Sequence, residues 1–292
     1  MLFKPRFIAV RCDKKVIASG RRYNFRNRRC ALGRRYVLRI LFSAYRQLRC
    51  VHLLCLWISR FMSMQFRFIV CASLLPALAF GHDLWIERSG PLSSLAYGHE
   101  RSGHEGSKRL EYKPETVKQA VCHDASARIL NAEPSRAYPV TLKGDCAVSW
   151  FLLSSGYWSK TPYGTKNLPK SEAGAVIASW QSIESIKRID RWSEALANPL
   201  TRELELVALE SPTSLKAGAK LHLRAYFQGK PATGVTVAYF GKPRGVTGAD
   251  GAVNIRLNEA GVQLIQASLE LPLDDGKADK AIHSTALQFE IE

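Results

Sequence analysis

The sequence predicts an all-β protein, in which an N-terminal β-sandwich-like domain is followed by a second β-sandwich. Two observations lead to this fold class. Short stretches of alternating apolar and polar residues recur along residues 82–292, and turn-forming Gly, Pro, Asn and Asp separate them. The alternation is clearest after residue 204. A chain of 292 residues is long enough for two such domains.

The positive charge of the chain is concentrated near its start. The formal net charge is +17, which by itself suggests a nucleic-acid or membrane partner. Residues 1–63, however, contain 16 Lys and Arg and one acid, Asp13, whereas residues 82–292 contain 25 Lys and Arg and 24 acids. The later part is therefore nearly neutral, and we expect no nucleic-acid partner. A basic nucleic-acid arm within residues 1–63 is the alternative.

Residues 1–63 carry no pattern that predicts a fold. They contain four of the seven cysteines and three Arg-Arg pairs, but no sustained apolar period. Arginines interrupt the apolar stretches, so there is no run of about 18 uncharged apolar residues that spans a bilayer. We interpret the segment as a disordered leader or as the result of a start codon assigned too early, with initiation at Met62 or Met64.

Residues 64–81 have the pattern of a secretory signal peptide. Arg67 forms the charged region, and an apolar run over residues 68–80 ends in small residues. Cleavage before Phe80 and cleavage before His82 both satisfy the small-residue rule. We therefore expect a periplasmic protein whose mature chain begins at or just before His82.

Two cysteines remain after export, Cys122 and Cys146. In an oxidising compartment a single disulfide between them is the default expectation. Two separate buried thiols are the alternative. A thiolate metal site is disfavoured, because neither cysteine belongs to a Cys-x-x-Cys pair.

The mature chain begins with a predicted β-hairpin. Residues 82–87 and 92–100 are extended in pattern, and residues 88–91, Arg-Ser-Gly-Pro, form a turn signal between them. Antiparallel pairing across this turn places residues opposite each other when their numbers sum to 181 or 182. His82 then lies opposite His99 or Glu100.

The middle of the chain has a weaker pattern. Residues 117–124 and 148–153 read as strands, and the aromatic and basic segment 156–167 reads as an ordered, irregular loop. Apolar residues then recur at spacings of three and four over residues 177–196, which predicts a helix.

The C-terminal part predicts a series of short strands. Residues 220–227 alternate between apolar and polar, and residues 235–239, 253–257 and 287–291 do the same. Strands at this spacing predict an immunoglobulin-like sandwich of the carboxypeptidase-regulatory-like kind. With a boundary near Pro199, we divide the mature chain into domains at residues 82–199 and 200–292.

Three histidines, His82, His99 and His104, cluster within 23 residues. Imidazole nitrogen binds copper, nickel, zinc and iron, and a planar nitrogen set favours Cu(II) or Ni(II). A cut before His82 adds the terminal amine of the same residue, whereas a cut before Phe80 creates a Phe-Gly-His chelate. Both nitrogens titrate low enough to bind a metal near neutral pH. The alternative is that the three side chains are ordinary solvated histidines.

Sequence signatures of common enzymes are missing. The chain contains no Gly-x-Ser-x-Gly, no His-Glu-x-x-His and no phosphate-cradling glycine loop. The acidic residues are scattered through turns, with no pair that suggests general acid and base catalysis. We therefore expect no catalytic residues.

Several short motifs occur in a fixed order along the mature chain: His82-Asp-Leu-Trp-Ile-Glu, Tyr97-Gly-His-Glu, Trp158-Ser-Lys-Thr-Pro, Lys166-Asn, Ser179-Trp180, Leu204-Glu-Leu-Val and Asp250-Gly251. In this order and spacing they resemble the NikM-like periplasmic family, a domain of unknown function that is associated by gene neighbourhood with nickel and cobalt uptake. The resemblance covers essentially all of residues 82–292. It implies an exported all-β protein with an N-terminal metal-handling end, in which His82 and His99 match the recurring histidines of the family.

These observations lead to one principal hypothesis and two alternatives. We expect a periplasmic accessory protein that binds Ni, Co or Cu through His82, His99 and His104 and hands the ion to a membrane transporter. The first alternative is a copper-dependent oxidase that uses the terminal histidine as a brace. The second is a structural envelope module without a metal.

Overall fold

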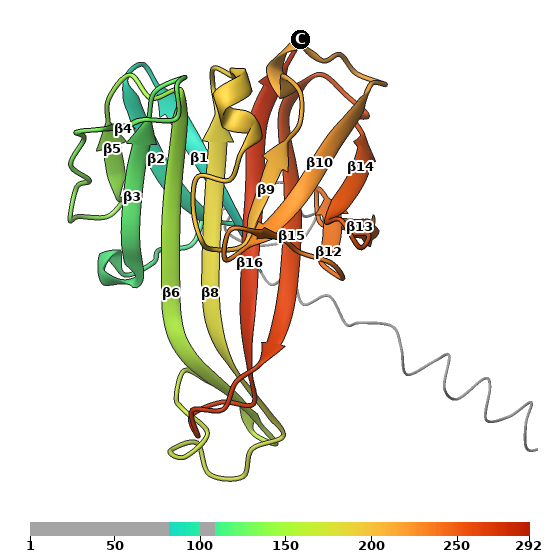
Figure 1. Ribbon diagram of the computed structural model, residues 1–292. Coiled ribbons are helices and arrows are strands. Elements are labelled where there is room, and N and C mark those ends of the chain that lie inside the picture. The colour runs from blue at the N-terminus through green and yellow to red at the C-terminus, as the bar shows by residue number, and fades with distance from the viewer. Residues whose placement is uncertain (1–81, 100–108) are drawn as a thin grey trace, which may run out of the picture. The chain divides into compact units, whose positions relative to one another are not determined.

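The computed structural model describes residues 82–99 and 109–292, which belong to one compact unit (Figure 1). In these residues the regular secondary structure is almost entirely β-strand, which confirms the predicted fold class. The first strands are β1 (Asp83–Ser89), β2 (Leu92–Gly98), β3 (Val117–His123), β4 (Ile129–Leu130), β5 (Thr141–Lys143), β6 (Val148–Thr161), β7 (Gly164–Lys166) and β8 (Ala178–Ile189). The later strands are β9 (Glu205–Ala208), β10 (Lys220–Phe227), β11 (Lys230–Pro231), β12 (Thr236–Tyr239), β13 (Lys242–Val246), β14 (Ala252–Arg256), β15 (Gly261–Pro272) and β16 (Lys280–Ile291).

The helical elements are short. The described chain has the 3-10 turns η1 (Pro114–Thr116), η2 (Glu194–Ala197) and η3 (Pro212–Ser214). Within the part of the chain that the structure describes, no helix is long and apolar enough to cross a membrane.

The strands form three sheets. The largest has the order β13-β12-β15-β16-β8-β6-β3-β4, with β7 paired to β6 at one end. A smaller sheet, β1-β2-β5, contains the first hairpin, and a third contains β11-β10-β14 with β9 paired to β10. Neighbouring strands are antiparallel except β8 and β16, which pair in parallel.

The large sheet is the middle of three layers (Figure 1). Because successive side chains of a strand point to opposite faces, each of its strands contributes to two cores. On β8, Ile186 packs with Leu84 and Leu95 of the first hairpin, whereas Ile189 packs with Leu206 and Leu223 of the third sheet. Full burial of such a side chain contributes about 1.5–3 kcal/mol to stability.

The helix predicted over residues 177–196 is wrong. Ala178–Ile189 is strand β8, and only the single turn η2 follows it. The spacing of three misled the prediction because β8 is covered on both faces, so its apolar residues need not alternate. Ile186 and Ile189, three residues apart, belong to the two different cores.

The irregular loop predicted over residues 156–167 is also wrong. Strand β6 continues to Thr161 after an irregularity between Leu153 and Gly156, and β7 turns back along it. Trp158 lies directly across from Trp180 of β8 in this extension. Trp158 is thus the cross-strand neighbour of another aromatic residue, whereas Tyr163 lies in the exposed turn between β6 and β7.

The division of the mature chain at Pro199 falls between β8 and β9. Strand β8, which precedes the division, is hydrogen-bonded to β16, which follows it. The large sheet is therefore continuous across the division. Two separately folding domains stay a prediction.

Gly251 occupies a position that only glycine fits. Its φ is +76°, and a Cβ atom there would lie 2.7 Å from the backbone oxygen of Ala225 and 3.1 Å from the nitrogen of Ala232. The Gly251 carbonyl also accepts a hydrogen bond from the Ala225 N–H at 2.9 Å. The turn before β14 is thus pressed against β10.

We expect Gly251→Ala to lower the free energy of unfolding by about 2–4 kcal/mol, because left-handed backbone strain and steric overlap add. Urea denaturation of the mature protein measures the change. Gly276→Ala is the matched control: its φ is +72° and no atom lies within 4 Å of the added Cβ, so only the strain of about 1–2 kcal/mol applies. Equal losses in the two variants would contradict the steric argument.

Candidate metal site at the open end of the first hairpin

The two histidines that flank the first hairpin lie side by side. Strand β1 pairs with β2 in the register Asp83↔Gly98 to Ser89↔Leu92, so paired residue numbers sum to 181. This register, one of the two that the sequence allowed, places His82 opposite His99. The two imidazole ring centroids are 4.8 Å apart, with an interplanar angle of 51°.

Tyr97 extends this pair into a group of three rings. Its hydroxyl lies 3.0 Å from His82 Nδ1, and the two ring centroids are 5.0 Å apart. Nδ1 is also the ring nitrogen that closes a chelate with the backbone nitrogen of the same residue, so a metal held in that way would take the place of the Tyr97 hydroxyl. Sequence reasoning missed Tyr97, although its place two residues before His99 puts both side chains on one face of β2.

The surroundings of His82 and Tyr97 favour the neutral forms of these two side chains. Burial lowers the pKa of His82 below its usual range, and the neighbouring His99 lowers it further, while Asp83 opposes the shift. Burial raises the pKa of Tyr97 to about 12, and the charge of Glu184 adds to this shift. At neutral pH, His82 is therefore a neutral imidazole that can bind a metal.

The chain on either side of the group is held in place. Asp83 accepts a hydrogen bond from Gln266 Nε2 of β15 at 2.7 Å. Arg109, where the described chain resumes, bridges to Gly98 and forms an ion pair with Glu87. The open end of the hairpin is thus attached both to the middle sheet and to the segment that follows.

The other described histidines do not join this group. His104 lies outside the described residues. His123 is buried in β3, His222 contacts Glu210 at 2.8 Å, and His283 packs against Phe227 with ring centroids 4.7 Å apart. Among residues 82–99 and 109–292, no three His, Cys, Asp or Glu side chains are arranged to hold a metal ion.

A groove of about 400 Å³ lies apart from the histidines, along η1 and β3. Its lining includes Pro114, Lys118, Arg136 and Val140, without a histidine or a cysteine. It therefore adds no metal-binding side chain to the candidate site.

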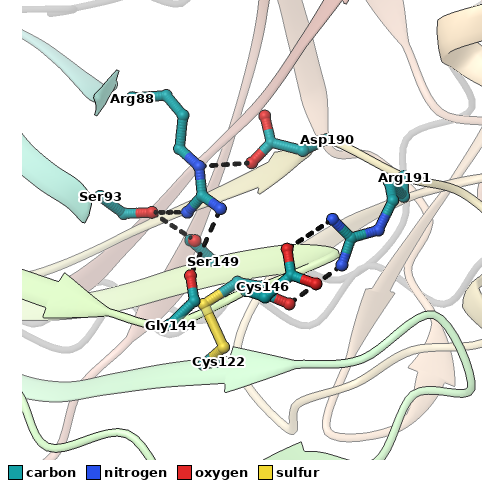
Figure 2. Close-up of a disulfide and its surroundings, with 9 residues drawn as sticks. Arg88, Ser93, Cys122, Gly144, Cys146, Ser149, Asp190 and Arg191 are labelled. Atoms are coloured by element: carbon teal, nitrogen blue, oxygen red, sulfur yellow. Dashed lines mark hydrogen bonds and ion pairs between the residues drawn. A yellow bond between two sulfur atoms is a disulfide. The ribbon is translucent and has the colours of Figure 1, made fainter. Parts of the chain in front are cut away.

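The opposite, turn end of the hairpin is fastened close to a disulfide (Figure 2). Cys122 and Cys146 are joined with their Cα atoms 5.1 Å apart, and both side chains are buried. Beside them, Arg88 donates to Ser93 Oγ at 2.7 Å and to the Gly144 carbonyl at 3.3 Å, and its guanidinium lies 3.6 Å from Asp190. This network was not predicted from the sequence, because its members are distant in the chain.

The fold and the site define a class: a three-layer all-β protein that presents a pair of histidines at the open end of its first hairpin. Residues 79–271 match the model of a family described as a domain of unknown function, DUF4198. The match covers more than half of the chain, which therefore belongs to this family. No curated protein matches the chain.

We expect replacement of Cys122 and Cys146 by alanine to lower the free energy of unfolding by about 3 kcal/mol. The bond closes a loop with a sequence separation of 24, and its loss restores loop entropy to the unfolded chain. Chemical denaturation of the mature protein, with and without a thiol reductant, measures the change. Reductant should destabilise the wild type and leave the double variant unaffected; a double variant as stable as the wild type would refute a stabilising role.

Proposed function

We propose that the protein is a periplasmic metal-binding accessory protein that captures Ni(II), Co(II) or Cu(II) and passes the ion to a membrane transporter. The observation that carries the proposal is the contact between the rings of His82 and His99, 4.8 Å apart at the open end of the first hairpin. A shared ion would require one nitrogen of each ring at about 2 Å from the metal, and the closeness of the two rings is the basis for proposing it.

The proposed signal cleavage supplies further ligands at the same place. A cut before His82 frees an amine on the residue whose imidazole already faces His99, so one residue provides two nitrogens. A cut before Phe80 instead provides an amine and two backbone amides that bind a square-planar ion together with His82. In either case the full ligand set forms only after export.

The surroundings of His82 support binding of a cation. Its lowered pKa leaves the imidazole neutral at neutral pH, so little proton competition opposes the metal. Tyr97 and the Asp83–Gln266 bond orient this end of the hairpin. The resemblance to a family associated with nickel and cobalt uptake supports these two ions, whereas the nitrogen set equally suits copper.

An enzymatic role is the second candidate, and the same pair of rings supports it. A terminal amine with its own imidazole and a second imidazole form a histidine brace for copper. This reading requires an open coordination position beside a substrate surface. Peroxide formation by the copper-loaded mature protein in the presence of ascorbate would favour it over transport.

The test is calorimetric titration of the processed protein with Ni(II), Co(II) and Cu(II), after its N-terminus has been determined by mass spectrometry. We expect a sub-micromolar Kd for at least one ion and a Kd at least about 10-fold higher in His82→Ala and in His99→Ala, because each loses a ligand.

The matched control for this titration is His222→Ala, which removes an exposed histidine from a different sheet and should leave the Kd unchanged. Absence of binding tighter than micromolar would contradict the proposal and favour a structural envelope module. A native N-terminus upstream of residue 62 would contradict the proposed leader.

A further inference from the structure

The turn that joins β6 to β7 lies at one end of the middle sheet. Figure 1 shows that β6 and β8 extend beyond the other two sheets, and that the segment between them forms loops at this end. Among the described residues, seven large apolar side chains are exposed, and three of them belong to this segment: Tyr163 (93%), Ile177 (63%) and Leu168 (37%). We call residues 157–168, together with Ile177, the β6–β7 tip.

Hydrogen bonds to β6 hold the three apolar residues of the tip close together. The Ile177 N–H donates to the Lys160 carbonyl at 2.8 Å, which places Ile177 beside the end of β6. Ser159 Oγ donates to the Leu168 carbonyl at 2.9 Å, which places Leu168 beside the same strand. Ser159 and Lys160 are consecutive on β6, so the exposed apolar residues form one surface near the turn.

Tyr163 is fixed at the turn through its backbone. Its N–H donates to Thr161 Oγ1 at 3.2 Å, and the same hydroxyl donates to the Gly164 carbonyl at 2.9 Å. Within residues 82–99 and 109–292, no residue forms a hydrogen bond or a ring contact with the Tyr163 side chain. An exposed aromatic residue on a fixed backbone loses little conformational entropy when it is bound.

The tip carries positive charge on both sides of Tyr163. Residues 157–168 contain Lys160 and Lys166 and no acid. Lys160 lies opposite Thr165, and Lys166 lies opposite Ser159, so the two lysines are on opposite faces of the hairpin and flank its turn. Neither lysine forms an ion pair with another described residue.

The acids of the neighbouring loops lie outside this hairpin. They are Glu172, Asp274, Asp275 and Asp279. Asp279 forms an ion pair with Lys170 at 3.0 Å, and Asp275 accepts a hydrogen bond from the Tyr157 hydroxyl at 2.7 Å. The other two are exposed on loops 167–177 and 273–279. The charge directly around the turn is therefore positive.

We propose that the β6–β7 tip docks on an anionic phospholipid bilayer, with Tyr163 in the interface and Lys160 and Lys166 beside the headgroups. Tyrosine is enriched at membrane interfaces, and anionic lipids attract lysines near the surface. At about 3.3 Å per residue, each lysine lies within about 10 Å of Tyr163 along the hairpin, and its long side chain reaches the headgroups. The tip contains no residue of the histidine site, so this inference goes beyond the proposed function and does not depend on it.

The experiment measures sedimentation of the processed protein with vesicles of phosphatidylglycerol and phosphatidylcholine in equal parts, and with vesicles of phosphatidylcholine alone. We expect partition into the anionic vesicles only, and its loss in high salt because the attraction is screened. Lys160→Gln and Lys166→Gln should each lower the partition coefficient about fivefold. Tyr163→Ser should lower it at least about threefold. Lys216→Gln, an exposed lysine between η3 and β10, is the matched control and should leave it unchanged.

A fluorophore attached to Tyr163→Cys tests whether the tip itself contacts lipid. Cys122 and Cys146 are joined to each other, so the introduced thiol is the single free one in residues 82–292. We expect its emission to shift to the blue with anionic vesicles, and no shift for the same label on Ala217→Cys, which is exposed before β10.

Equal partition of all variants, or a label at position 163 that does not shift, would overturn the inference. Absence of partition into anionic vesicles would overturn it as well, and would direct attention to an acidic protein surface as the occupant. The metal titration of the same processed protein is a separate measurement, so failure of either proposal leaves the other standing.

Discussion

One buried side-chain amide holds the first hairpin on the middle sheet. Among the strands of residues 82–99 and 109–292, β1 lies at the edge of its sheet, and none of them pairs with the outer side of Ile86. Gln288 of β16 accepts from this N–H at 2.7 Å and donates to this carbonyl at 3.0 Å. The amide thus replaces a strand at an edge that would otherwise bury unpaired backbone groups. Because the two residues are 202 positions apart, the last strand of the protein positions the first described strand.

The orientation of the candidate site depends on this anchor, because side chains alternate between the two faces of a strand. Fixing Ile86 over Gln288 also fixes which alternate residues of β1 face the sheet, and His82 is one of them. A shift of one residue in the hairpin would turn His82 and Tyr97 to the opposite face of the hairpin. The Arg88 network near the disulfide and the Asp83–Gln266 bond oppose such a shift at the two ends of the strand. The orientation of the two histidines is therefore determined by contacts of neighbouring residues on β1 and not by contacts of the histidines themselves.

The features predicted correctly from the sequence are local ones. The hairpin register follows from a turn signal and strand alternation, so the His82–His99 contact could be anticipated to within one residue. The helix over residues 177–196 could not be rejected in the same way, because a strand buried on both faces loses the alternation that distinguishes it. The position of Tyr97 beside His82 could also have been predicted, because Tyr97 and His99 are two residues apart and therefore lie on one face of the hairpin.

A second buried polar contact holds the third sheet on the opposite face of β8. Glu205 of β9 accepts from Lys187 Nζ at 2.6 Å and from the backbone N–H groups of Leu200 and Thr201 at 2.9 Å, so the charge of this carboxylate is compensated. Lys187 is adjacent to Ile186 on β8, so its side chain lies on the face away from the first hairpin. Buried polar groups that are fully satisfied specify one arrangement of the layers. The Lys187–Glu205 pair does this on one face of the middle sheet, and Gln288 does it on the other.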